Sequence, residues 1–149
     1  AARALGGSAL AETARPTVTA LRDVTGESAQ LWLPDGEWRV CLLSVEATHE
    51  LRTIVDEGSR VAIDVGSGGR ALQGEAGTAG WVATVGERAD GVGSVSAGVL
   101  GPSGRVVAAG GSSGPVGRLG EDPGARVGAD VVAAANELSE ALGVPPRHG

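Results

Sequence analysis

The chain has 149 residues, 42% of them hydrophobic and 20% charged, which suits one folded domain and excludes a disordered tail. A formal net charge of −6 argues against a surface that binds nucleic acid through its phosphates. No apolar run approaches the ~20 residues of a membrane span and the first residues lack a secretory pattern, so we expect a cytoplasmic protein without membrane contact.

The first half of the chain predicts a helix followed by a β-hairpin. Residues 16–24 carry apolar side chains at helical spacing, and the proline at the first of these positions suits the first turn of a helix. Residues 28–45 alternate in polarity around the turn signal Asp35-Gly36, which is typical of two antiparallel strands. Short β-like segments follow at 51–55 and 60–63.

The second half predicts a glycine-rich turn, a second hairpin and a long helix. The turn lies at residues 66–69, and segments 92–100 and 105–109 form the hairpin-like pair. From residue 123 to 142 apolar residues recur every three or four positions, behind an acidic start and before Gly143, which would end the helix. This order favours an α+β fold with helices packed against an antiparallel sheet.

The residues that most often carry chemistry are sparse. Cys41, the single cysteine, lies in an apolar run and is expected to be a small buried hydrophobe. His49 and His148 are too far apart in sequence to indicate a zinc site. His49 is the one realistic general base, but no nucleophile motif accompanies it, which favours an exposed loop histidine. We therefore expect no enzyme, no metal and no cofactor.

Glycine and serine are concentrated where a ligand could lie. Residues 66–69 could cradle an anion with their backbone N–H groups, although the ending of a nucleotide-binding loop is missing and a simple turn is favoured. Strand periodicity places small residues, serines among them, on one face, either to accommodate a small polar ligand or as a close-packed sheet edge. These residues are Val92, Ser94 and Ser96 in one strand, and Gly111 and Ser113 in the other.

Four segments carry a resemblance to a known family. They are LRDVTGESAQLWLPDGEWRVCL (21–42), GSRVAIDVGSGGRAL (58–72), GWVATVGERADGVGSVSAGVLGPSGRVVAAGGSSGP (80–115) and ADVVAAANELSEALG (129–143). In this order they resemble the effector-binding domain of the IclR family of transcriptional regulators, over most of residues 10–143. The wording of the first and third segments is similar to the actinobacterial branch that controls leucine biosynthesis and amino-acid-dependent metabolism.

The resemblance implies a sheet of about six antiparallel strands flanked by helices, as in GAF and PAS sensor domains, with a pocket for a small metabolite, usually a carboxylate. Hydroxyl and backbone N–H groups would bind that carboxylate, rather than a fixed cation. Departures from the family pattern at Asp64, Arg70, Thr84 and Ser94 leave the identity of the effector open. The implied pocket positions are Val61, Ser67, Gly68, Thr84, Val92, Ser94, Gly111 and Ser113.

The resemblance also implies how the domain is organised. Residues 1–149 would be a single effector-binding domain, with 1–9 a linker remnant, 10–143 the domain body, and a winged helix-turn-helix domain expected before residue 1. The family has a longer helical stretch where this chain has only 73–79, so a missing segment is expected there. The expected partners are a small effector, a second copy in a homodimer or homotetramer, and DNA only through the absent domain. The alternative is a structural dimerisation module of the same fold that binds no ligand.

Overall fold

The computed structural model describes residues 2–142 and the side chains from residue 9 onward. In chain order the elements are α1 (Ala2–Thr25), β1 (Ser28–Asp35), β2 (Trp38–Val45), β3 (Arg60–Ala62), α2 (Ser67–Leu72), the 3-10 helix Gly77–Ala79, β4 (Val82–Val85), β5 (Val92–Leu100), β6 (Val106–Pro115), α3 (Val116–Leu119) and α4 (Pro123–Ala141). Within this part of the chain six strands form one antiparallel sheet, in the order β3-β2-β1-β6-β5-β4. The predicted α+β class and both predicted hairpins are confirmed, with the first tight turn at residues 36–37, one residue later than expected.

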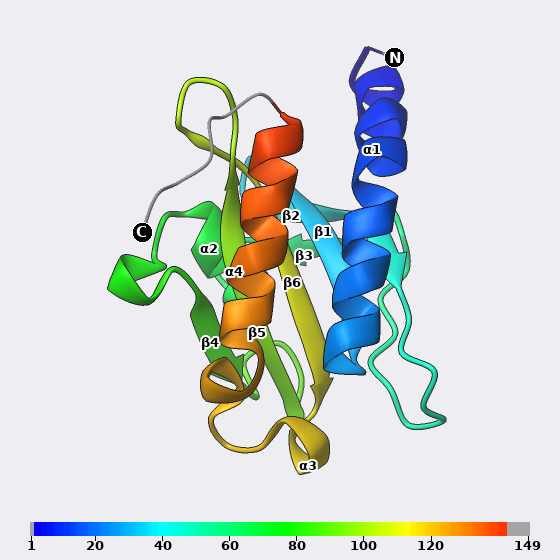
Figure 1. The fold of residues 1–149 in the computed structure, drawn as a ribbon, viewed down its shortest axis with the longest axis vertical. Helices are drawn as coiled ribbons and strands as arrows, with labels where there is room; N and C mark the ends of the chain where they lie inside the picture. The colour runs from blue at the N-terminus through cyan, green and yellow to red at the C-terminus, as the bar shows by residue number, and fades with distance from the viewer. Residues whose placement is uncertain (1, 143–149) are drawn as a thin grey trace.

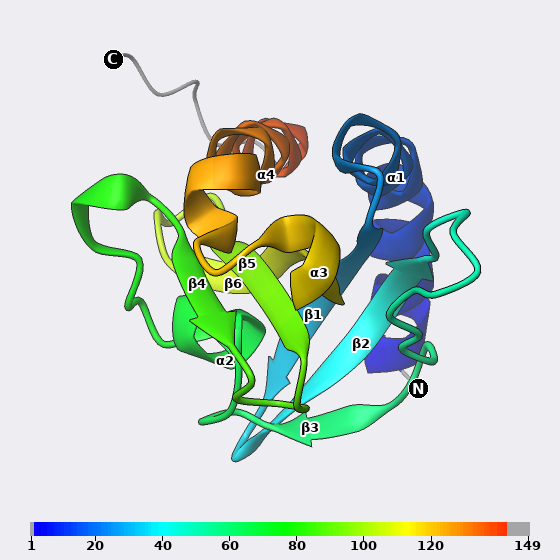
Figure 2. The same ribbon diagram turned by 90° about the horizontal axis from the view of Figure 1, so that it is seen from below.

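The sheet separates two layers of helix. Helices α1 and α4 lie side by side on one face, and α2 lies on the other (Figure 1 and Figure 2). The main hydrophobic core fills the space between the sheet and the α1–α4 layer and includes the fully buried Leu31, Val95 and Val131. A smaller cluster that contains Trp32 and Cys41 lies on the α2 side.

A β-bulge in the first hairpin decides which residues of β2 face α2. Trp32 pairs with Cys41, but the next pair is Leu31 with Leu43, so one residue of β2 is extra. An extra residue changes the side to which the following side chains point. Leu43 therefore joins the core under α1 and α4, whereas Arg39 and Cys41 stay on the same face as Trp32.

Helix α1 is longer than predicted. It begins at Ala2, so the expected linker remnant is helical from residue 2, and Pro16 lies in its interior rather than in its first turn. A proline inside a helix removes one backbone hydrogen bond and usually breaks the helix. Here the neighbouring Ala14 and Val18 are 0% and 2% exposed, so packing against the sheet outweighs the local preference.

One predicted strand is absent, and another strand was not predicted. Residues 51–55 form a loop, in which the carbonyl oxygens of Leu51 and Thr53 accept hydrogen bonds from the side chains of Arg118 and Ser28 instead of a neighbouring strand. Strand β4 was not predicted from periodicity, because four residues at the edge of a sheet give too short a pattern.

Helix α4 begins as predicted. The Asp122 side chain accepts a hydrogen bond from the Ala125 N–H at 3.3 Å, which caps the helix. Gly143, the predicted stop, lies outside the described residues. Trp81 packs directly on the α4 backbone, where a Cβ added at Gly128 would lie 2.6 Å from the indole ring. Between residues 2 and 142, no helix has the length and apolar character needed to cross a membrane.

Candidate ligand-binding site

A small polar cavity lies on the face of the sheet that α2 covers. Strand register places Ser94 beside Ser113 and Ser96 beside Gly111 at the centre of this face, as the alternation of residue types predicted. The cavity volume is about 20 Å³, room for about one water molecule. Its lining includes Gln30, Trp32, Arg39, Ser67, Arg88 and Ser94.

A chain of hydroxyl groups runs along one wall of the cavity. Ser67 Oγ at the start of α2 shares hydrogen bonds with Ser94 Oγ at 2.7 Å and with Ser96 Oγ at 2.8 Å. Thr84 Oγ1 on β4 extends the chain to Ser94 Oγ at 2.9 Å. Each hydroxyl both donates and accepts, and its hydrogen rotates freely, so the wall adapts to a donor or an acceptor on a ligand.

Glycine is required beneath this wall. A Cβ built on Gly111 would clash with Ser96 Oγ and lie 2.6 Å from the Val95 carbonyl oxygen. A Cβ on Gly68 would lie 3.1 Å from the Trp32 ring and 3.3 Å from Arg39 Nε. The glycines therefore let α2 and the strands approach each other closely around the cavity.

The Arg39 guanidinium lies inside the cavity wall, and no family position or sequence pattern predicted it. Arg39 is 2% exposed, its Nη1 donates to the carbonyl oxygens of Ala62 and Val65, and it lies 4.5 Å from the centroid of the Trp32 ring. Its Nε has no hydrogen-bond partner among the described residues. Burial, and next the positive charge of Arg88, lower the pKa of Arg39 to about 10. The expectation that a ligand is bound without a fixed cation thus stays a prediction, although a guanidinium lines this cavity.

A larger hollow of about 390 Å³ adjoins the cavity, and Arg88 lines both. Arg88 is partly buried in the loop between β4 and β5, and burial lowers its pKa. The hollow is bounded on one side by the loop of residues 46–59 and on the other by Val92 and Pro115. The Arg88 side chain thus lies between the enclosed cavity and the open surface.

A buried ion pair fixes the loop of residues 46–59 beside this hollow. Arg118 Nε donates to Glu27 Oε2 at 2.7 Å and its Nη2 donates to Oε1 at 2.9 Å, and Nη2 also donates to the Leu51 carbonyl at 2.6 Å. Ser28 Oγ donates to the Thr53 carbonyl at 2.6 Å. The Glu27 side chain is only 4% exposed, so this carboxylate depends on Arg118 for its counter-charge.

The implied pocket positions fall into three groups. Ser67, Gly68, Ser94 and Ser113 line the cavity. Thr84 and Gly111 lie directly behind lining residues, as described above. The other two lie elsewhere: Val92 lines the outer hollow, and Val61 packs against the cluster around Trp32 and Cys41.

The lining residues that were missed include Gln30, Trp32, Arg39 and Arg88. Gln30 and Arg39 are long polar side chains inside largely apolar strands. This contrast was the one sequence signal that could have marked them as site residues. A strand that is polar at one internal position either exposes it or buries it for a purpose. The alternation alone does not say which, because the bulge in β2 changes the facing of its residues.

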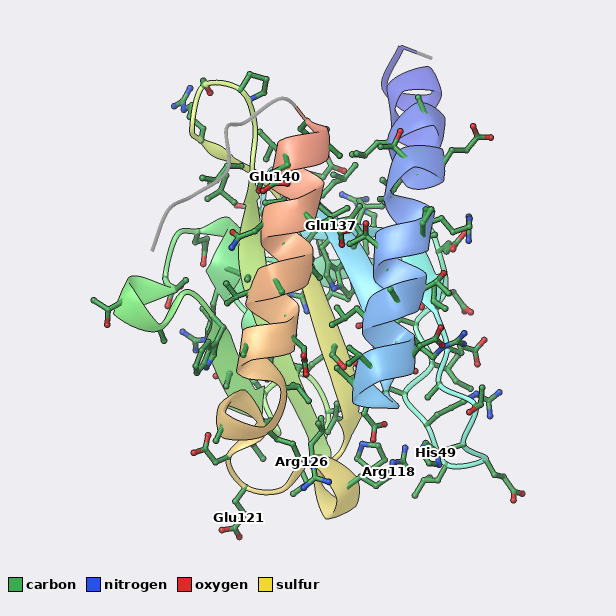
Figure 3. The ribbon with its side chains drawn as sticks, viewed as in Figure 1. His49, Arg118, Glu121, Arg126, Glu137 and Glu140 are labelled. Atoms are coloured by element: carbon green, nitrogen blue, oxygen red, sulfur yellow. The ribbon has the colours of Figure 1, made fainter. Side chains whose placement is uncertain are left out.

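The remaining chemistry-bearing residues lie apart from the cavity. Figure 3 shows His49 on the loop at the far end of the molecule, near Arg118, where it is exposed as expected. Within residues 2–142 there is no group of three or more histidine, cysteine, aspartate or glutamate side chains that could hold a metal ion, and His148 lies outside this range.

Cys41 is expected to be unreactive in the folded protein. It is 1% exposed, and burial, and next the negative charge of Glu57, raise the pKa of its thiol to about 12. Because a raised pKa keeps the thiol neutral near pH 8, a disulfide reagent should react about a hundredfold or more slowly with folded than with urea-unfolded protein. The absorbance of the released thiol measures both rates, and equal rates would contradict the buried placement.

The arrangement defines a GAF-type α+β domain with a polar cavity under α2. Solved structures of IclR-family transcriptional regulators share this fold. A Rhodococcus sp. protein assigned to this family superposes with a TM-score of 0.77 at 24% identity, over 87% of this chain and 62% of that one. The Thermotoga maritima IclR protein superposes with a TM-score of 0.81 at 18% identity, over 90% of this chain and 68% of that one. A separately crystallised IclR-family domain gives 0.82 at 19% identity and is covered over 98% of its length.

At these identities the comparisons establish the fold. The chain spans 62% of the length of the Rhodococcus protein. No protein-family profile matches the sequence, and no curated protein matches it significantly.

Proposed function

We propose that this chain is the small-molecule-sensing domain of an IclR-type transcriptional regulator, with the cavity under α2 as its effector site. The effector in this proposal is a small metabolite that carries a carboxylate. Binding it would shift the balance between two arrangements of the paired domains that hold the DNA-binding heads. The same proposal includes DNA-binding domains outside this chain, the pairing of subunits, and a link to leucine or amino-acid metabolism.

The observation that carries the proposal is a pair of polar groups that lack hydrogen-bond partners in an enclosed place. Gln30 Nε2 and Arg39 Nε are buried without a partner among the described residues, in side chains that are 3% and 2% exposed. Buried polar groups in folded proteins nearly always have partners, and leaving one unpaired costs about 1–3 kcal/mol. Both groups line the cavity, where a ligand oxygen would satisfy them.

Binding is tested by thermal shift and calorimetry with 2-oxo acids, hydroxy acids, leucine-pathway intermediates and amino acids. A true effector at a hundred times its Kd should stabilise the fold by ~2.7 kcal/mol. Ser94→Ala should weaken that binding about fivefold to tenfold, because it removes a hydroxyl that would bind the ligand and that links Ser67 to Thr84 in the wall. Ser103→Ala, in the exposed turn between β5 and β6, is the matched control and should bind as the wild type does.

One observation favours the ligand-free structural module instead. The cavity holds only about 20 Å³, and the Arg39 side chain fills space that an effector would need. If the cavity serves only as a polar core, every compound in the panel should leave the melting temperature unchanged, and Ser94→Ala should affect stability alone. That result would exclude effector binding and leave dimerisation, tested by sedimentation, as the function.

A further inference from the structure

The Arg39 side chain lines the cavity, and one edge of its guanidinium is free of hydrogen bonds among the described residues. All its hydrogen bonds within the described residues come from Nη1, which donates to the carbonyl oxygens of Ala62 and Val65. Nε remains unpaired, on the side of the group that faces Gly68. Arginine binds a carboxylate with two parallel N–H groups along one such edge. Because the guanidinium has donors only and a positive charge, an oxyanion is the acceptor that suits this edge best.

No carboxylate of the described residues neutralises this charge. Neither Arg39 nor Arg88 has a carboxylate oxygen within 4.0 Å in residues 9–142. Glu87, the acid next to Arg88 in sequence, accepts instead from Arg70 Nε at 2.9 Å and from the Gly66 N–H at 3.1 Å. A buried cation without a counter-charge is costly, although this protein has more acidic than basic residues and a net charge of −6.

The two cations are placed at different depths. Arg39 lies inside the enclosed cavity, whereas Arg88 lines both the cavity and the outer hollow. Two other charged residues line that hollow: Arg52, which is paired with Glu46 at 2.8 Å, and the exposed Asp90. A ligand that enters from the hollow would therefore meet Arg88 first and Arg39 last.

We infer that the ligand of this site is a small linear dicarboxylate, with one carboxylate on the free edge of Arg39 and the amide of Gln30, and the other on Arg88. This inference rests on the proposed function and narrows its effector to a dianion with two separated charges. The charge separation follows from the different depths of the two guanidinium groups, and the hydroxyl wall would contact the carbons or substituents between the two ends. Because the closed cavity has room for only about one water molecule, seating the ligand requires the Arg88 side chain to move toward the outer hollow, where its guanidinium would hold the second carboxylate.

Calorimetric titration of the chain with malonate, succinate, glutarate and adipate tests the inference, with the monoamide of each acid as its matched partner. The best dicarboxylate should bind at least about tenfold more tightly than its monoamide, because the monoamide has the same length but only one negative charge. Arg88→Gln, on a partly exposed loop, should reduce the affinity for the diacid to that for its monoamide. Arg126→Gln, which removes an exposed cation on α4, should preserve it.

The other outcomes separate the two proposals. Equal affinity for diacid and monoamide, or a difference that survives Arg88→Gln, would overturn the dicarboxylate assignment. If inorganic phosphate bound more tightly than every diacid, the inference that the ligand carries two separated charges would be overturned. Binding of only neutral or singly charged metabolites, with amide shifts at Ser94 and Ser96 in NMR spectra, would reject the dianion and keep the sensing function. Failure of every small molecule would remove both.

Discussion

Gly69→Ala is expected to lower the free energy of unfolding by about 3 kcal/mol or more, or to prevent folding. A Cβ at this position would clash with the Ile63 carbonyl oxygen, lie 2.6 Å from the Ile63 carbonyl carbon and lie 2.9 Å from Arg39 Nη1. Backbone on one side and a buried guanidinium on the other leave no flexible group to yield. Relief would require α2 to move off the sheet, which would open the cavity.

Urea unfolding of the variant measures the loss. Gly117→Ala is the control, because no heavy atom lies within 4 Å of a Cβ there and alanine favours the helical conformation of α3. It should leave stability unchanged or raise it slightly. A Gly69→Ala protein that unfolds within about 0.5 kcal/mol of wild type would show that α2 does not pack as closely as the structure indicates.

Arg118→Met should cost about 2–3 kcal/mol of stability and loosen the loop of residues 46–59. The substitution leaves the buried Glu27 carboxylate without its counter-charge and frees the Leu51 carbonyl. The partial exposure of Arg118, at 29%, keeps the expected cost at the lower end of the range for buried pairs. Denaturant unfolding measures the stability, and amide hydrogen exchange across the loop measures its loosening.

A double substitution separates the charge from the packing. Glu27→Gln combined with Arg118→Met removes both charges, and it should recover part of the loss seen in Arg118→Met alone. Arg126→Met is the control, since Arg126 is exposed on α4 at the same end of the molecule (Figure 3) and should change stability by less than about 0.5 kcal/mol. An Arg118→Met protein as stable as this control would mean that the ion pair contributes nothing net.

Local signals were sufficient for most of the fold. The turn residues between two alternating segments predicted both hairpins, and the three-and-four spacing behind an acidic start predicted α4. These features depend on residues close together in the sequence. The start of α1 and the loop at 51–55 were wrong because each depends on distant partners: the sheet that holds the helix across Pro16, and the side chains that bind the loop carbonyls.

The candidate site was predictable only in part for the same reason. The small polar face of β5 and β6 follows from strand periodicity, and Ser94 and Ser113 do lie side by side on it. The positions of the two arginines do not follow from strand periodicity. The facing of Arg39 depends on the bulge in β2, and the position of Arg88 depends on how the loop after β4 folds. The charge of the site, and with it the class of ligand, therefore comes from the three-dimensional arrangement.

The contact between Arg39 and Trp32 makes the fluorescence of Trp32 sensitive to changes in the cavity. The chain has three tryptophans and no tyrosine, so its ultraviolet fluorescence comes from indole rings alone. Trp38 is 43% exposed and Trp81 packs on α4, whereas Trp32 is 4% exposed and faces the guanidinium that lines the cavity. Any event that moves or neutralises that guanidinium alters the surroundings of this one indole. The protein thus carries its own fluorescent probe at the bottom of the cavity, and a titration can be followed without a label.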